Sequence, residues 1–470
     1  MKVCLLNDSF APVIDGVVNV VMNYASHLMQ DHGAEVIVGT PKYPDADYSS
    51  YPYQVVPYQS FDTSALVHGY RAGNPFERKS VMELAAFAPE IIHTHCPATA
   101  TVMARLLREE TGAPIILTYH TKFDIDIARA VKNKLVTKEA IRILVNSVEA
   151  CDDVWVVSRG AGESLKALGY EGHYRVMNNG VDFEKGRAVP KMVEEVTAGY
   201  DLPAGVPVFL FVGRIMTYKG LPMILDALKL LSETGQDFRM VFVGKGPDRE
   251  LLENKAEELG LMGNSETPGK CIFTGPIYDR EKLRAWNTRA DLFLFPSTYD
   301  TNGLVVREAA ACGLASVLVE GSCAAEDVTH GRNGYTIEET PEAMAALLRE
   351  LCGNLDQVHE AGERAMNEIV FLWRDCVRQA YDRYQVILAE KRVGILPKRK
   401  KLPSDRLLHL TARIMEEQER SHRVWKELFH DFKETAAGMM ENIYEAEVNA
   451  QQLPGPSGRQ DQDPPGEKRE

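Results

Sequence analysis

The stretch LFLFPSTYDTNGLVVRE at residues 292–308 carries the strongest structural signal in this chain. Its four apolar residues at 292–295 are typical of a buried parallel strand, and a Pro-Ser pair ends that strand. The pattern then turns into a helix, so Asp300 and Glu308 lie eight positions apart on either side of the helix start. Open parallel sheets bind ligands at the carboxyl ends of their strands. We therefore expect both carboxylates to face a ligand.

Similar apolar runs alternate with helical patterns along most of the chain. In the first half they lie at residues 3–6, 36–38, 91–93, 115–118 and 154–157. A second series lies at residues 208–212, 240–243, 271–273, 292–295 and 315–319. This alternation predicts an α/β fold of two doubly wound, Rossmann-like domains that face each other across a cleft. We place the domains at residues 1–190 and 191–370, with the polar stretch at 183–203 as the hinge.

Helical patterns flank this two-domain body. The first predicted helix has one apolar face, formed by Val17, Val21, Tyr24 and Leu28. Residues 371–390 form one long helical pattern that we expect to pack on a domain face. Residues 391–450 follow as a basic, amphipathic helical extension, and the proline-containing residues 451–470 are expected to be disordered.

The composition excludes several classes of protein. The net charge of -14 over 470 residues argues against a general binder of nucleic acid. The 8 cysteines include no C-x-x-C pair, which indicates reduced thiols and a cytoplasmic protein. No run reaches the roughly 18 apolar residues that a membrane span needs. His93 and His95 lack the Cys or carboxylate pattern of a metal site, so we expect no metal.

Two cations are predicted at the same sheet edge as the carboxylates. Arg214 ends the apolar run at 208–212, and Lys219 follows five residues later, just before a helix. Arginine chelates phosphate oxygens, lysine supplies a point charge, and a helix start adds free amides. The pair is suited to a pyrophosphate. The alternative is a pair of solvated surface cations.

Three other strand ends carry candidate ligand groups. Gly244 and Gly246 follow the run at 240–243 and would let the backbone approach a base or ribose, although a plain strand-to-helix turn needs the same glycines. Gly16 lies between the first strand and its helix, where amides can meet a phosphate. His120 follows the run at 115–118 and is a cleft candidate, although a lone histidine is more often structural. Glycines at 160 and 162 are interpreted as a helix entry.

Together these residues resemble the nucleotide-sugar domain of retaining glycosyltransferases with the GT-B fold, in the fourth sequence family. The resemblance rests on the Gly-Arg and Lys-Gly pairs around 214 and 219, the segment 296–308, the Ala-Ala-Cys-Gly run at 310–313 and the Gly-Arg-Asn-Gly-Tyr run at 331–335. The first domain adds the segment 7–16 and the Thr-Tyr-His-Thr run at 118–121, so the resemblance covers residues 1–390.

The resemblance implies a role for each matching residue. Arg214 and Lys219 would bind the donor diphosphate, Glu308 the nucleotide ribose and Asp300 the donor sugar. The backbone of Asn302, Gly303 and Leu304 would reach sugar or phosphate, and His120 would lie near the reacting carbon. The family usually has glutamate where this chain has Asp300, so the sugar itself stays open.

The reaction that these residues imply needs no metal. Breaking a glycosyl-phosphate bond leaves negative charge on the diphosphate, which Arg214, Lys219 and helix-start amides would stabilise. The family retains configuration, and we expect same-face attack in which the departing phosphate helps to take the acceptor proton. A covalent intermediate on Asp300 is the less favoured route.

The acceptor is predicted from a basic segment in the first domain. Residues 122–142 place cations among apolar residues, as in segments that lie on anionic membranes. The cations are Lys122, Arg129, Lys132, Lys134, Lys138 and Arg142. The region resembles bacterial enzymes that glycosylate diacylglycerol or phosphatidylinositol. We expect transfer of glucose from UDP-glucose to a membrane lipid, at the inner face of the cell membrane.

Several alternatives remain open from the sequence. The basic segment can equally be a solvated helix face. The acceptor can be a soluble sugar or a cell-wall precursor, and Asp300 raises the alternative of a nucleotide-sugar-binding regulator without turnover. The extension after residue 390 can bind membrane, dock on the protein or pair with another copy.

Overall fold

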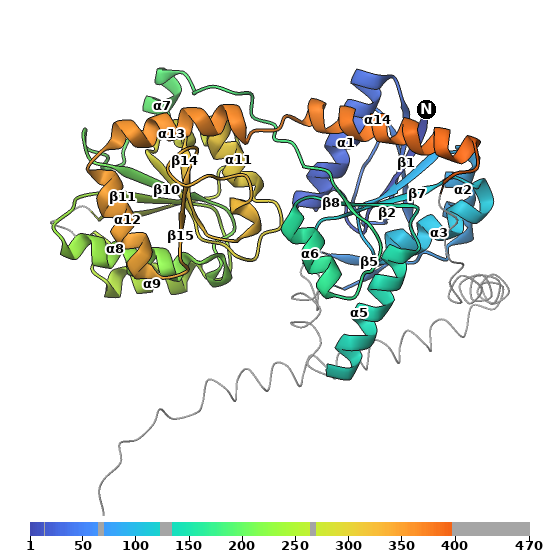
Figure 1. The fold of residues 1–470 in the computed structure, drawn as a ribbon, viewed down its shortest axis with the longest axis horizontal. Coiled ribbons are helices and arrows are strands. Elements are labelled where there is room, and N and C mark those ends of the chain that lie inside the picture. The colour runs from blue at the N-terminus through green and yellow to red at the C-terminus, as the bar shows by residue number, and fades with distance from the viewer. Residues whose placement is uncertain (14, 64–69, 123–133, 264–268, 397–470) are drawn as a thin grey trace, which may run out of the picture.

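The structure is a computed structural model that describes residues 1–13, 15–63, 70–122, 134–263 and 269–396. Two parallel sheets with helices on their faces form two lobes that lie side by side (Figure 1). This arrangement confirms the predicted pair of Rossmann-like domains.

The first domain is built on a seven-stranded sheet with the order β3-β2-β1-β6-β7-β8-β9. Its strands are β1 (Lys2–Leu6), β2 (Glu35–Pro41), β3 (Gln54–Tyr58), β6 (Ile91–Thr94), β7 (Ile115–Tyr119), β8 (Asp153–Val156) and β9 (Arg175–Val176). Its helices are α1 (Gly16–His32), α2 (Arg78–Ala86), α3 (Thr99–Thr111), α5 (Lys134–Glu149) and α6 (Arg159–Ala167). A small antiparallel hairpin, β4 (Ser60–Asp62) and β5 (Arg71–Gly73), lies beside them.

The second domain has a six-stranded sheet with the order β12-β11-β10-β13-β14-β15. Its strands are β10 (Val208–Val212), β11 (Arg239–Val243), β12 (Cys271–Gly275), β13 (Leu292–Phe295), β14 (Ala315–Val319) and β15 (Tyr335–Ile337). Its helical segments are α7 (Pro190–Thr197), η1 (Thr217–Lys219), α8 (Leu221–Glu233), α9 (Arg249–Glu258), α10 (Arg280–Arg289), α11 (Leu304–Ala311), η2 (Cys323–Ala325), α12 (Pro341–Cys352) and α13 (Leu355–Glu368). Neighbouring strands of both sheets run parallel, so the carboxyl ends of the strands in each sheet lie at one edge. Ligands of such sheets bind at that edge.

Helix α1 corrects one detail of the predicted apolar face. Its N-cap is Asp15, whose carboxylate accepts from the amides of the first turn at 2.8 Å. Val17 is only partly buried, whereas Val18 and Val20 are buried instead. The face is wider than predicted because α14 (Trp373–Arg392) packs beside α1 on the same face of the sheet, where Tyr384 bonds to His93 of β6 (Figure 1).

The chain crosses between the domains twice. On the way out, Val181 and Phe183 already pack in the core of the second domain, so the expected hinge at 183–203 is mostly attached to that domain. On the way back, Leu372 bridges Val181, and α14 then packs on the first domain. The two crossings lie side by side and pack closely. A Cβ added at Gly180 would lie 2.4 Å from the backbone nitrogen of Trp373, so only glycine fits there. The predicted extension after residue 396 lies outside the described residues.

Candidate active site

The carboxylate of Asp300 is paired with Lys219 at the edge of the second sheet. The Lys219 Nζ donates to both carboxylate oxygens, at 2.6 and 2.7 Å, and the Ser297 hydroxyl donates to Oδ2 at 2.5 Å. Lys219 is buried, and its ammonium lies 5.7 Å from the ring centre of Phe295. The sequence placed these two residues near one ligand, and the structure shows that they also bind each other.

Arg214 lies where the two domains face each other. Its side chain is exposed and makes no ion pair with another described residue. Across the cleft, Tyr70 donates to Asp15, the N-cap of α1, at 2.7 Å. Burial raises the pKa of Tyr70, Asp15 adds to that rise, and the Arg214 guanidinium opposes it. Arg214 is therefore close enough to act on the same region as the N-terminus of α1, where Gly16 lies.

The segment that carries Asp300 is bonded directly to the first domain. The Thr301 hydroxyl donates to the carbonyl of His120, and the Thr301 carbonyl accepts from Ser158 Oγ at 2.6 Å. Further cross-cleft bonds run from Lys122 Nζ to the Thr298 carbonyl, 3.0 Å, and from Asn302 Nδ2 to the Val157 carbonyl, 2.7 Å. The backbone of His120 is thus bonded to the residue that follows Asp300, whereas contact of its ring with a donor sugar stays a prediction.

A second cross-domain contact ends on the N-terminus of α6. Ser158 caps this helix, as the predicted helix entry requires, and its first amides donate to Glu326 of the other domain. The Arg159 amide lies 2.8 Å from Glu326 Oε2. A carboxylate is favoured there because the amides of a first helical turn carry partial positive charge. A Cβ at Gly160 would lie 2.6 Å from Cys323 Sγ and 2.8 Å from Glu326 Oε1, so a larger residue there would displace these side chains.

The two glycines after β11 have a structural explanation. A Cβ on Gly244 would lie 1.8 Å from the Gly213 carbonyl oxygen, and one on Gly246 would lie 2.0 Å from that of Ile215. The Ile215 amide donates to the Lys245 carbonyl at 3.0 Å, which joins the two loops. The glycines therefore hold the loop of Arg214 in place, whereas their contact with a nucleotide stays a prediction.

Glu308 has a partner that the sequence did not reveal. Its carboxylate accepts from Arg280 at 3.0 Å, and Arg280 also reaches Asp182 at 3.3 Å and lies over the ring of Phe183. Burial raises the pKa of Glu308, Arg280 opposes that rise, and Asp182 adds to it. Arg280 follows β12 and was visible in the sequence only as one arginine among many.

The turn before α11 is held by its own backbone and by the first domain. Gly303 has a φ of 60°, a left-handed conformation that favours glycine, and Leu304 starts the helix. Asn302 uses Nδ2 across the cleft, while its Oδ1 is buried without a hydrogen-bond partner among the described residues. The turn therefore places the N-terminus of α11 (Leu304–Ala311) close to Asp300 in the sequence. No side chain caps the backbone amides of that N-terminus in the described structure.

Two family models match the chain on either side of the interdomain crossing. "Glycosyltransferase Family 4" matches residues 14–185, and "Glycosyl transferases group 1" matches residues 193–368. The two segments hold all the candidate site residues described above and every strand of both sheets except β1. This chain belongs to the group 1 glycosyltransferases.

Curated relatives and solved structures are similar to this glycosyltransferase. Sulfoquinovosyl transferase SQD2 of Arabidopsis thaliana is 29% identical to this chain. The alignment covers 54% of this chain and 48%, or about half, of the length of that protein. Alpha-monoglucosyldiacylglycerol synthase of Acholeplasma laidlawii is 22% identical over 79% of this chain and 94% of its own length. The crystal structure of Anabaena HepE in complex with UDP has a TM-score of 0.65 at 17% identity and covers 82% of this chain and 100% of its own. The last similarity confirms the GT-B fold.

The predicted membrane residues of the glycosyltransferase are only partly described. Lys138 and Arg142 are exposed on α5, and Arg142 pairs with Glu139 at 2.6 Å. Arg129, Lys132 and the side chain of Lys134 lie outside the described residues. Over the described ranges, no helix combines the length and apolarity that a membrane crossing requires, and no group of three metal-ligating side chains occurs.

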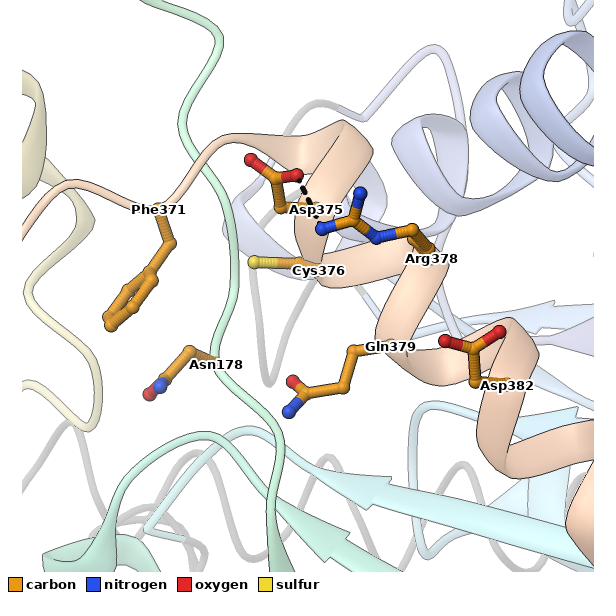
Figure 2. A pocket seen from close by; sticks show the side chains of 7 residues that line it. All are labelled: Asn178, Phe371, Asp375, Cys376, Arg378, Gln379 and Asp382. Atoms are coloured by element: carbon orange, nitrogen blue, oxygen red, sulfur yellow. Dashed lines mark hydrogen bonds and ion pairs between the residues drawn. The ribbon is translucent and has the colours of Figure 1, made fainter.

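A pocket of about 370 Å³ lies at the two chain crossings rather than among the donor-site candidates (Figure 2). It is lined by Asn178, Phe371, Asp375, Cys376, Arg378, Gln379 and Asp382. Most of these side chains come from the first turns of α14, where Asp375 and Arg378 form an ion pair. None of the predicted site residues lines it.

Proposed function

We propose that this protein is a retaining, metal-independent glycosyltransferase that moves glucose from UDP-glucose to a membrane lipid such as diacylglycerol. The observations that carry the proposal are the Lys219–Asp300 ion pair at the edge of the second sheet and the nearness of Arg214 to Tyr70, which is bonded to the N-cap of α1. Two cations beside a carboxylate that can bind a sugar suit a nucleoside-diphosphate sugar.

The proposed reaction uses these groups in a fixed order. The bond between the sugar carbon and the phosphate oxygen breaks, and its electron pair leaves with the diphosphate. Arg214 and Lys219 stabilise that charge, so a divalent cation is not required. The acceptor hydroxyl attacks from the same face and passes its proton to the departing phosphate oxygen. Donor turnover in the presence of a chelator tests the metal-independent part.

The contacts of Asp300 favour this route over a covalent one. Lys219 binds both carboxylate oxygens and Ser297 binds one of them. A carboxylate engaged in this way is a weaker nucleophile, because the bonds stabilise the charge that it would have to donate. Asp300 is better suited to accept a sugar hydroxyl while Lys219 reaches a phosphate.

A lipid acceptor is supported by the names of the relatives and by the basic segment. Alpha-monoglucosyldiacylglycerol synthase is named for a glycolipid product. Lys138 and Arg142 place exposed charge on α5, where an anionic membrane would attract it. A soluble sugar, a cell-wall precursor or a regulator without turnover remain outcomes of the test.

One experiment separates these outcomes. The purified protein is incubated with a panel of uridine, guanosine and adenosine diphosphate sugars and a bacterial lipid extract, and products are identified by mass spectrometry. A hexosylated lipid formed only with UDP-glucose supports the full proposal. Products in the aqueous phase alone contradict the lipid acceptor, and nucleotide binding without hydrolysis or transfer contradicts enzymatic turnover.

Arg214→Ala should raise the donor KM and lower kcat, by about tenfold to a hundredfold in kcat/KM together. Its guanidinium has no competing ion pair among the described residues, and its attraction to the phosphate strengthens as the bond breaks. Initial rates against donor concentration measure both constants. Arg364→Ala is the matched control, because that arginine is 45% exposed on α13, where it pairs with Glu360. Unchanged kinetics at position 214 would contradict the assignment.

Donor binding should weaken at acidic pH through Glu308. The ionised carboxylate accepts ribose hydroxyls, and because burial raises its pKa from the ordinary 4.5, it becomes protonated at a higher pH than an exposed glutamate. The donor KM therefore rises as pH falls through that raised pKa. Arg280→Met should move this rise to higher pH, and Asp182→Asn should move it to lower pH. Shifts in the same direction for both variants would exclude this electrostatic arrangement.

Deletion of residues 397–470 should reduce sedimentation of the protein with anionic liposomes while donor affinity is unchanged. The cut leaves α14 complete, since Leu396 still packs beside it and the Ile395 amide donates to the Glu390 carbonyl. Attraction between a basic segment and anionic lipid falls with salt, so the difference should shrink at high ionic strength. Deletion of residues 451–470 alone is the control. Equal sedimentation of the long deletion and the intact chain would contradict the membrane role.

A further inference from the structure

The ring of His120 is held by a second buried histidine. His95 follows β6 and is only 2% exposed, and its Nδ1 lies 3.1 Å from Nε2 of His120. The two rings are stacked, with an angle of 22° between their planes. Among the described residues, the bond to His95 is the one that orients the His120 ring. The Nδ1 atom of His120 has no hydrogen-bond partner among the same residues.

The other nitrogen of His95 has no partner either. Its Nε2 is buried without a hydrogen bond among the described residues. Aromatic rings surround it, with Tyr24 edge-on at 5.3 Å and His93 at 4.1 Å between ring centres. By contrast, His93 is satisfied at both nitrogens, through Tyr384 at 2.6 Å and Thr118 at 2.7 Å. His95 therefore makes one directed bond, and that bond goes to His120.

The proton between the two rings has two arrangements. Burial lowers the pKa of His120 to about 3, and burial with His93 and His120 nearby lowers the pKa of His95 well below its usual range. Both rings are neutral at pH 7, so each carries one proton. If His120 donates, His95 keeps a buried N–H without an acceptor, whereas if His95 donates, only a bare ring nitrogen is left. Orphaned buried donors are rarer than orphaned acceptors, which favours donation by His95.

We propose that His95 is a positioning residue that donates from Nδ1 to Nε2 of His120, so that His120 offers an Nδ1–H to the ligand in the cleft. The proposal rests on the proposed function, in which His120 faces the donor sugar. His120 then acts as a hydrogen-bond donor to a sugar hydroxyl or to the departing oxygen, and it takes up no proton from the acceptor. This assignment agrees with same-face attack, where the phosphate takes that proton.

The test compares two substitutions of His95. His95→Phe keeps a ring of similar size but removes the bond to His120, and should lower kcat by about 10- to 100-fold with little change in donor KM. His95→Asn keeps an amide where Nδ1 lies and should restore most of the loss. Thermal melting and UDP affinity check that both variants fold. Equal kcat for the phenylalanine variant and the wild type would overturn the positioning role.

Nitrogen-15 spectra of histidine-labelled protein read the tautomer without turnover. The His120 signals, assigned with His120→Gln, should show a protonated Nδ1 in the wild type and in His95→Asn, and a mixture of tautomers in His95→Phe. A protonated Nε2 in the wild type would overturn the direction of donation. This readout also separates the two proposals: absence of transfer from every donor contradicts the function, while the tautomer still decides the role of His95.

Discussion

Replacement of Lys219 by methionine should lower kcat by roughly 100- to 1000-fold, the effect expected when one preorganised charge is removed from a developing anion. Methionine keeps the length and most of the volume of the lysine stem, which is buried beside Phe295. The substitution therefore removes the ammonium charge and leaves the packing of the stem largely unchanged. Asp300 already orients that ammonium with two bonds of 2.6 and 2.7 Å, so it needs no rearrangement to meet a phosphate.

The measurement is transfer under single-turnover conditions, so that product release does not mask the chemical step. Lys229→Met is the matched control, because that lysine is 41% exposed on α8, where its partner among the described residues is Glu233. A fall in kcat for both variants would point to a general loss of structure. A normal kcat for Lys219→Met would contradict the role of Lys219 in stabilising the leaving group.

Asp300→Asn should abolish most transfer and also destabilise the fold, by on the order of 3 kcal/mol. The amide can still accept one bond, but the ammonium of Lys219 is left with its charge uncompensated in a buried place. Removing one partner of a buried pair costs more than the pair contributes, because the remaining charge has lost its hydration. Urea unfolding followed by fluorescence measures the loss of stability, and initial rates measure the loss of transfer.

The double variant Lys219→Met with Asp300→Asn separates the two effects. It should recover much of the stability, because no unpaired charge remains, but none of the activity. Asp300→Glu is the conservative control, since it restores the acid that the family usually has at this position. Equal stability of Asp300→Asn and the wild type would show that the ion pair is not important for folding, although the same residues could still bind the donor.

The pattern of the chain was enough to predict both sheets. Each run such as 208–212 or 292–295 is short, apolar and flanked by turn residues, and the corresponding strands β10 and β13 have these bounds. Three strands of these sheets were missed. The strand β15 has only three residues without clear alternation, both residues of β9 are exposed, and β3 contains Pro57, which argues against a strand. Local periodicity reports only how a segment is buried, so very short or exposed edge strands leave no signal.

The sequence by itself determined the fold class and the candidate residues, because strand ends and the helix start at 304 are encoded by neighbouring residues. The tertiary structure alone decided their partners. Lys219 and Asp300 are 81 positions apart, and His95 and His120 are 25 apart. Arg280 reaches Glu308 because α10 and α11 pack together, and α14 returns to the first domain beside the outgoing crossing. Such contacts depend on how the sheets and crossings pack in space, and no local pattern records that packing.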